Sequence, residues 1–298
     1  MTAALDVREV RYRYGDALAL DGATLSIGER QRVALLGRNG SGKTTLLGLA
    51  SGLLAVQDGV VSVCGSDIRH DPAGSRAHIG VVFQHLAVDS ALTVTETLRL
   101  QAALTSIERP AQPDRIRQAI SDAGLSERAE DRVGTLSGGL SRRLDLVRAL
   151  LNRPAQALKE EPTTGLATLA REAFWSLLDR RRADGAQVIA THLMDEAERC
   201  DRVVILHEGR IVADGTPAEL TDSLGGDAVW LDTPAPGPLA DRTGGRVIGG
   251  RVMLTVPDAS RVVTELYDSE DVTSVTARSV QMSDVFAAAV GEEPRADG

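Results

Sequence analysis

The sequence predicts an α/β fold in which helices cover a mostly parallel sheet. Short apolar runs rich in β-branched residues, several of them bounded by glycine, alternate with stretches of helical length and composition, which is typical of strand–helix–strand units. The clearest of these runs are residues 32–36, 79–83, 188–190 and 203–206. The chain has 298 residues, of which 43% are apolar, so we expect one domain of about 200 residues and a smaller one.

The charge balance and the cysteines exclude some classes of protein. Aspartate and glutamate number 42 against 33 lysines and arginines, and the net charge of −9 argues against a nucleic-acid binder that relies on a basic face. Two cysteines, Cys64 and Cys200, cannot form a disulfide framework and favour a reducing compartment. We expect no membrane span, because no run of about 18 apolar residues occurs. We also expect no signal peptide, because charged and apolar residues alternate over the first 16 positions.

The elements before residue 220 are predicted from periodicity and composition. Residues 5–14 alternate as a strand does, and residues 25–27 form a strand after an expected turn at Asp21-Gly22. The buried run 32–36 is followed by glycines and then by a helix over 44–54. Further strands are expected at 60–63 and in the apolar runs named above. Residues 93–151 are mostly helical in composition, with breaks expected at Arg109-Pro110, Pro113, Gly124 and Gly138-Gly139.

Composition changes after about residue 220. Gly225-Gly226 and residues 234–238 (PAPGP) predict a linker. Two apolar stretches around Gly249-Gly250 indicate a hairpin within 247–256, and residues 259–267 suit a short helix. We therefore predict a domain over 1–222 with a helical subdomain at about 86–150, a small α+β domain over 223–290, and a disordered tail over 291–298.

Residues 37–44 (GRNGSGKT) match the phosphate-binding pattern G-x-x-x-x-G-K-[ST], between a predicted strand and a predicted helix. Glycines let several backbone N–H groups point at one phosphate, and the helix adds its positive N-terminal end. Lys43 supplies a charge toward the β- and γ-phosphates, and the Thr44 hydroxyl can ligate Mg²⁺. By itself this loop predicts a nucleoside triphosphate site and no particular reaction.

Further motifs follow in an order that resembles the ATP-binding subunits of ABC transporters. The sequence LSGGLSRR at 136–143 is similar to the signature loop of that family, and Gln84 after VVF is similar to its Q-loop. The sequence EPT at 161–163 matches the end of the Walker B strand, GL at 165–166 the start of the D-loop, and His192 after VIAT the switch histidine. The resemblance covers about residues 5–220, and SDVF at 283–286 resembles the closing helix of the drug-exporter branch.

The resemblance implies a P-loop NTPase core of ABC type with an antiparallel β part near the N-terminus, a helical subdomain and a small C-terminal α+β domain. It implies that two such domains face head to tail, as a homo- or heterodimer, with ATP between the phosphate loop of one chain and the signature loop of the other. Transport would then need separate transmembrane permease chains, and the subunit would lie at the cytoplasmic face of the cell membrane. We expect the membrane chains to dock near residues 84–96 and the direction to be export.

The family also implies a role for individual residues, with ATP and Mg²⁺ as cofactors. Glu161 would orient or deprotonate the attacking water, His192 would contact the γ-phosphate, and Gln84 would sense the metal or the water. Thr44, Gln84 and Glu160 are the candidate metal ligands. The expected ATP-binding residues are Tyr14, Gly37, Arg38, Asn39, Gly40, Ser41, Gly42, Lys43, Thr44, Thr45, Ser137, Gly138 and Gly139.

Several of these assignments have plain structural alternatives. Gln84 could be a polar strand end that faces solvent, and a lone histidine such as His192 after a strand is often structural outside this order of motifs. Tyr14, which would stack on adenine, could be ordinary packing, and Tyr12 on the same face of its strand is a rival. Residues 137–139 could simply cap and start a helix.

The sequence departs from the family pattern around the Walker B strand. Glu160 replaces the usual aspartate, and Lys159 stands where an apolar residue is expected. A buried lysine is costly, so we expect Lys159 either to pair with Glu160 or to reach water at an open strand end. Ala167 removes the D-loop aspartate, and Leu140 replaces the signature glutamine.

These departures leave two hypotheses. The chain is a working ATPase subunit of an exporter, as the retained Glu161 and His192 favour. Alternatively it binds ATP but hydrolyses it poorly, as a regulatory module or the degenerate half of a pair, which Lys159, Glu160 and Ala167 favour. A soluble ABC-type ATPase of DNA repair or translation fits less well, because such proteins usually carry tandem ATP domains or a long coiled coil.

Overall fold

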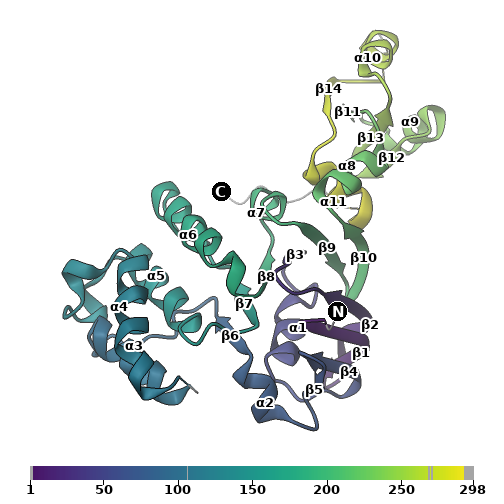
Figure 1. Cartoon of the computed structure of the whole chain (residues 1–298). Coiled ribbons are helices and arrows are strands. Elements are labelled where there is room, and N and C mark those ends of the chain that lie inside the picture. The colour runs from purple at the N-terminus through teal and green to yellow at the C-terminus, as the bar shows by residue number, and fades with distance from the viewer. Residues whose placement is uncertain (1–2, 106, 268, 270, 292–298) are drawn as a thin grey trace.

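The computed structural model describes residues 3–105, 107–267, 269 and 271–291. Within these residues the strands form three sheets, with helices packed around them (Figure 1). No helix in the described ranges has the length and apolarity needed to cross a membrane. Apart from Gly291, the tail that we predicted to be disordered lies outside the described residues.

The largest sheet has six strands in the order β10-β9-β3-β8-β7-β6. All neighbours in it are parallel except β10, which is antiparallel at one edge. Helices lie on both sides, so the central strands are buried on both faces and consist largely of apolar residues. This confirms the predicted α/β class. The strands are β3 (Arg32–Leu36), β6 (Ile79–Val82), β7 (Gln156–Glu160), β8 (Ala186–Thr191), β9 (Arg202–His207) and β10 (Arg210–Gly215).

A four-stranded antiparallel sheet, in the order β2-β1-β4-β5, shares a core with one face of the large sheet. Its strands are β1 (Leu5–Tyr14), β2 (Ala17–Ile27), β4 (Asp58–Val63) and β5 (Ser66–Asp67). The turn expected at Asp21-Gly22 is wrong, because β2 runs through these residues and the chain turns at Gly15-Asp16. Gly22 has a φ of 76° where the β1–β2 register shifts, so this glycine forms a bulge within the strand.

The segment between β6 and β7 is helical, as predicted. It contains α3 (Val94–Leu104), α4 (Gln112–Asp122) and α5 (Gly138–Ala149), joined by short 3₁₀ turns. Pro113 is not a break, because it lies in the first turn of α4, where no backbone N–H is needed. The breaks expected at Arg109-Pro110 and Gly124 lie between these helices, whereas Gly138-Gly139 begin α5.

The remaining helices of this part flank the large sheet. They are α1 (Lys43–Ala50), α2 (Pro72–Ala77), α6 (Thr168–Arg180), α7 (Met194–Glu198) and α8 (Pro217–Leu224). Helix α1 is shorter than the predicted 44–54, since Gly52 takes a φ of 71° just beyond its end.

The third sheet is antiparallel, in the order β12-β13-β11-β14. Its elements follow a βαββαβ order: β11 (Asp227–Asp232), α9 (Pro236–Thr243), β12 (Arg246–Ile248), β13 (Arg251–Val256), α10 (Ala259–Tyr267) and β14 (Ser274–Ser279). The predicted hairpin and the short helix after it are confirmed. Residues 234–238 are not simply a linker, because Pro236 begins α9.

Helix α11 (Met282–Val290) joins the third sheet to the rest of the molecule. Its residues Met282, Val285 and Phe286 belong to the core that lies under α3–α7, whereas Ala287 packs with Trp230 of the third sheet. In Figure 1, α11 and α8 lie between β10 and the third sheet. The buried carboxylate of Asp284 accepts a 2.8 Å hydrogen bond from the indole of Trp230.

Candidate nucleotide site

Loops from four neighbouring strands meet at the carboxyl edge of the large sheet. Gly37 follows β3, His192 follows β8, Glu161 follows β7 and Phe83-Gln84 follow β6. In α/β proteins this edge is where ligands bind. The fold therefore gathers motifs that are more than a hundred residues apart in the sequence.

The phosphate loop has the backbone that its glycines permit. Gly42, directly before α1, has a φ of 107°, and a Cβ atom there would lie 2.6 Å from the carbonyl oxygen of Ala19. A Cβ atom on Gly37 would lie 2.5 Å from the carbonyl oxygen of Leu206. Any larger residue at these two positions would force the loop open. The loop thus places the N-terminus of α1, with its unpaired N–H groups, beneath the predicted phosphate position.

Lys43 is buried and folds back over its own loop. Its Nζ donates hydrogen bonds to the carbonyl oxygens of Gly37, at 2.7 Å, and Arg38, at 2.9 Å. Burial lowers the pKa of this ammonium group, and the carboxylates of Glu161 and Glu160 partly oppose that effect. A phosphate would offer Lys43 stronger, charge-assisted acceptors than these carbonyls.

Glu161 lies between the two other candidate catalytic side chains. Its Oε1 is 3.0 Å from Nδ1 of His192, and its Oε2 accepts a 3.3 Å hydrogen bond from Nε2 of Gln84. Glu161 also has a left-handed backbone, with a φ of 42°, which is unusual for a residue with a side chain. The structure therefore brings the predicted triple of Gln84, Glu161 and His192 into direct contact.

Glu160 contacts the phosphate-loop threonine. The Thr44 hydroxyl donates a hydrogen bond to Oε1 of Glu160 at the end of β7. A hydroxyl and a carboxylate are hard oxygen donors of the kind that Mg²⁺ takes alongside its waters. The two predicted metal ligands thus fit such an ion by chemistry and by proximity, whereas Gln84 is turned toward Glu161.

Tyr14 and Tyr12 differ in exposure although they are two residues apart. Tyr14 is 51% exposed and Tyr12 only 9%; Tyr14 is the last residue of β1, next to the turn at Gly15-Asp16. The hydroxyl of Tyr14 lies 3.5 Å from the hydroxyl of Thr45 on α1, and its ring packs edge-on to Tyr12. Of the two rings, only that of Tyr14 has an open face beside the phosphate loop.

The signature sequence lies on a different part of the molecule. Ser137 is the N-cap residue of α5 but makes no capping hydrogen bond with its side chain, and Ser137 and Gly138 are exposed. Figure 1 shows α5 in the helical part, well apart from α1. Within one chain, residues 137–139 therefore do not join the phosphate loop, and a hydroxyl and amides remain directed outward.

Comparisons with known proteins agree with this arrangement. The family model described as "ABC transporter" matches residues 20–164. The "Nod factor export ATP-binding protein I" of Cupriavidus metallidurans is 35% identical over 305 residues, which span 99% of this chain and 100% of that protein. The chain belongs to the ABC transporter family. It is an ATP-binding subunit and an ATPase of that family.

Other relatives give the same answer. The protein of the same name from Burkholderia orbicola is 38% identical over 242 residues, 80% of each chain. Two solved structures superpose with a TM-score of 0.68 at 28% identity over 74% of this chain, an "ATP binding subunit of ABC transporter" and cbiO1 from Clostridium perfringens. They span 92% and 91% of those two chains. The second of these proteins is part of the ABC transporter complex cbiONQ.

The two expectations for Lys159 in this ABC ATPase are both wrong. Its side chain is 0% exposed, and Nζ has no hydrogen-bond partner among the described residues. Its strand β7 is paired on both sides, with β6 and β8, and its register partners Val82 and Ile189 are buried apolar residues. Burial, together with the charge of Arg32, lowers the pKa of Lys159 to about 7. Glu160 contacts Thr44 instead.

Sequence reasoning missed two buried residues that contact the segment 161–163. Arg142 on α5 donates a 2.8 Å hydrogen bond to the carbonyl oxygen of Pro162 and a 3.2 Å hydrogen bond to that of Glu161. Glu196 on α7 accepts a hydrogen bond from the hydroxyl of Thr163, and burial raises the pKa of this carboxyl group. A charged residue on the buried side of a helix beside a motif is the signal that could have found both.

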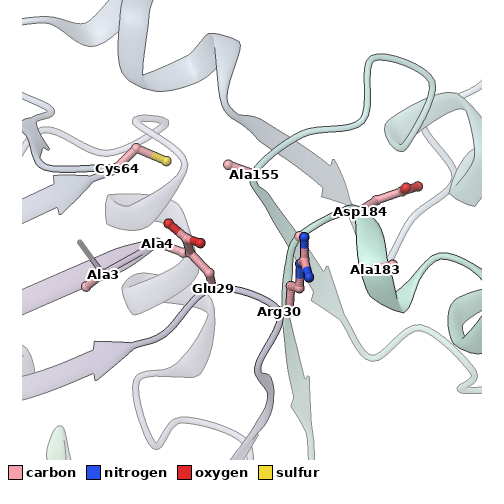
Figure 2. A pocket seen from close by; sticks show the side chains of 9 residues that line it. Ala3, Ala4, Glu29, Arg30, Cys64, Ala155, Ala183 and Asp184 are labelled. Carbon is pink, nitrogen blue, oxygen red and sulfur yellow. The ribbon is translucent and has the colours of Figure 1, made fainter. Parts of the chain in front are cut away.

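The ABC ATPase also has a hollow far from this edge. A cavity of about 360 Å³ is lined by residues 3–4, 29–30, 64, 155 and 183–185. Figure 2 shows the sulfur of Cys64 turned toward Ala155, with Glu29 on the same side of the view and Arg30 near Ala183 and Asp184. Residues 29–30, 155 and 183–185 precede β3, β7 and β8, so the cavity lies at the amino ends of these strands, opposite the site. Burial raises the pKa of the Cys64 thiol, which makes it a poor nucleophile.

Proposed function

We propose that this subunit binds Mg-ATP at the phosphate loop and hydrolyses it with Glu161 as general base, to drive export through separate membrane-spanning chains. The contact of Glu161 with both Gln84 and His192, at the mouth of the phosphate loop, carries this proposal. In that geometry His192 orients the carboxylate, and Gln84 reports its state to the helical part that follows β6.

The phosphate loop binds the nucleotide in this proposal. The backbone N–H groups of residues 38–45 and the ammonium group of Lys43 hold the β- and γ-phosphates, which replace the carbonyl contacts of Lys43. The exposed ring of Tyr14 stacks on the adenine.

Thr44 and Glu160 hold Mg²⁺ in the same proposal. The ion would neutralise charge on the phosphates when bound. The Thr44 hydroxyl can ligate the ion through its oxygen while it still donates its proton to Glu160. Glu160 is one methylene longer than the family's aspartate, so its carboxylate is displaced from the aspartate's position. We expect weaker metal binding than an aspartate would give.

The outward-facing signature loop completes the site of a second subunit. Ser137, Gly138 and Gly139 bind the γ-phosphate in trans, which explains why the Ser137 hydroxyl makes no capping bond. Ala167 in place of a D-loop aspartate leaves this interface without one carboxylate. The proposal also includes the division of the chain into an ATP-binding domain over 1–222, a small α+β domain over 223–290 and a tail over 291–298.

Export and a membrane partner are proposed from the relatives that match the whole chain. Those proteins are named for Nod factor export. We propose that the membrane chains dock on the segment 84–96, which connects Gln84 to α3. Such a subunit works as a peripheral protein on the cytoplasmic face of the membrane.

The test is a comparison of ATP binding with ATP turnover. We expect Glu161→Gln to lower kcat about 100-fold or more while the Kd for Mg-ATP changes less than about threefold, because an amide keeps the contacts but is no base. Lys43→Ala should lose binding itself. Equal turnover in the wild type and Glu161→Gln would reject Glu161 as the base.

A second candidate function is ATP binding without efficient hydrolysis. Glu160 favours it, because its carboxylate is one methylene longer than the family's aspartate and is displaced from that residue's place at the metal. Glu160→Asp, alone and with Lys159→Leu, separates the two functions. If either variant raises kcat about tenfold or more over the wild type, the natural site is a hydrolysis-deficient one.

A further inference from the structure

Arg142 is a buried cation in the helix that the signature loop begins. It lies five residues after Ser137 on α5 and is only 5% exposed. The Asp145 carboxylate on the same helix is 3.8 Å from it and is fully buried. A guanidinium in such a position needs hydrogen-bond acceptors for most of its five N–H groups.

Those acceptors are backbone carbonyl groups of the proposed catalytic loops. Nε donates to Pro162 at 2.8 Å, Nη2 donates to Glu161 at 3.2 Å, and Nη1 donates to Phe83, the residue before Gln84. One side chain thus holds the backbone at both Glu161 and Gln84. The planar fork of arginine suits three acceptors at fixed angles, which a lysine could not satisfy.

The backbone that Arg142 holds is the strained one. Glu161 has a φ of 42°, and such a conformation persists only where the surroundings determine it. Arg142 provides restraint from the α5 side, and Glu196 of α7 provides it from the other side through Thr163. The segment 161–163 is therefore clamped between the signature helix and the helix that follows His192.

We propose that Arg142 is a positioning residue that fixes Glu161 and Gln84 to the signature helix, so that movement of α5 on contact with a second subunit's nucleotide is transmitted to this chain's own catalytic carboxylate. The proposal rests on the function proposed above. It makes the two ATP sites of a pair interdependent, because each α5 contacts one nucleotide through its N-terminus and holds the base of the other site through Arg142.

Arg148 offers a matched control on the same helix. It too pairs with Asp145, at 2.7 Å, but its other hydrogen bonds go to Gln101 on α3 and to the carbonyl oxygen of Val81 within β6. Arg142→Gln and Arg148→Gln each remove one guanidinium from buried Asp145. Only the first removes the contacts with the backbone of Phe83, Glu161 and Pro162.

The first measurement is hydrogen exchange of the peptide 160–166 in the full chain. Its amides are protected, for example by the 2.8 Å bond from the N–H of Glu161 to the carbonyl oxygen of Ala190. We expect Arg142→Gln to speed its exchange about tenfold or more and Arg148→Gln to leave it within about twofold of the wild type. Equal effects of the two variants would overturn the proposal. Arg142→Lys, which keeps the charge, covers the case in which Arg142→Gln does not fold, and it should give an intermediate rate.

The second measurement is a double-mutant cycle with Glu161→Gln. Arg142→Gln should lower kcat about tenfold or more with the Kd for Mg-ATP little changed, and should have no further effect once Glu161 is glutamine. Additive losses would mean a general structural defect and would also overturn the proposal. Failure of the proposed function looks different: Glu161→Gln would then match the wild type, whereas the exchange measurement would still decide the role of Arg142.

Discussion

Lys159 is the residue whose environment is least expected for its chemistry. It occupies a central strand with its ammonium group fully buried and without a hydrogen-bond partner in the described part of the chain. Its pKa of about 7 lies far below the ordinary 10.5, chiefly because burial disfavours the charged form. Between these two pH values the unfolded chain binds more protons than the folded one, so the contribution of Lys159 to stability improves as pH rises.

We expect Lys159→Met to stabilise the protein by several kcal/mol near pH 6, because methionine fills the same space without a charge. The gain should shrink steadily between pH 7 and pH 10, where the wild-type lysine is neutral when folded. Urea unfolding at a series of pH values measures this difference. Leu158→Met, also fully buried on β7, is the control, and its difference from the wild type should not depend on pH. A gain for Lys159→Met that is constant with pH would contradict a neutral buried lysine.

At the scale of elements, the unit formed by β3, the phosphate loop and α1 concentrates the backbone constraints of the site. Gly42 combines a φ of 107° with a Cβ position 2.6 Å from a backbone oxygen. The loop can therefore cradle a phosphate only while that position stays without a side chain.

Gly42→Ala should destabilise the fold by about 2 kcal/mol or more and weaken ATP binding at least about tenfold, because the loop must open to admit the methyl group. Thermal unfolding and equilibrium nucleotide binding measure the two effects. In Gly237→Ala the new Cβ on α9 meets no atom within 4 Å, so this control should be neutral or slightly stabilising. If Gly42→Ala bound ATP with the affinity of the wild type, the proposed close approach of the loop backbone to the phosphate would be rejected.

At the scale of the whole molecule, α11 makes the third sheet part of the ATPase. Phe286 is 2% exposed in the core that also holds Phe174 and Leu144, and the other side of the same helix packs on the third sheet. One helix thereby contributes side chains to two cores, which favours cooperative unfolding of the third sheet and the rest of the molecule.

Phe286→Ala should cost about 3–5 kcal/mol and separate the unfolding of the two parts. Single-tryptophan variants can follow them, since Trp175 lies on α6 and Trp230 on β11. With Phe286 in place, Trp175 and Trp230 should report the same urea midpoint. In Phe286→Ala the midpoint reported by Trp230 should differ from that reported by Trp175. Val290→Ala, half-buried on the same helix, should keep the midpoints together. Separate midpoints already in the wild type would contradict the coupling.

The sequence alone determined the fold class and most of the candidate site. Glycine-bounded apolar runs, the GRNGSGKT loop and the later motifs have local signatures, and the structure brings Gln84, Glu161 and His192 together as those motifs predict. Such patterns can be recognised in the sequence because backbone conformation and strand periodicity are local properties.

Only the tertiary structure decided where the charged side chains go. Nothing in the sequence says that Lys159 is fully buried, that Glu160 contacts Thr44, or that Arg142 holds the backbone at Glu161. The prediction of a turn at Asp21-Gly22 was wrong for a related reason, because the β1–β2 register makes that glycine a bulge. Burial, pairing and pKa depend on neighbours brought together from distant parts of the chain, so a local pattern cannot encode them.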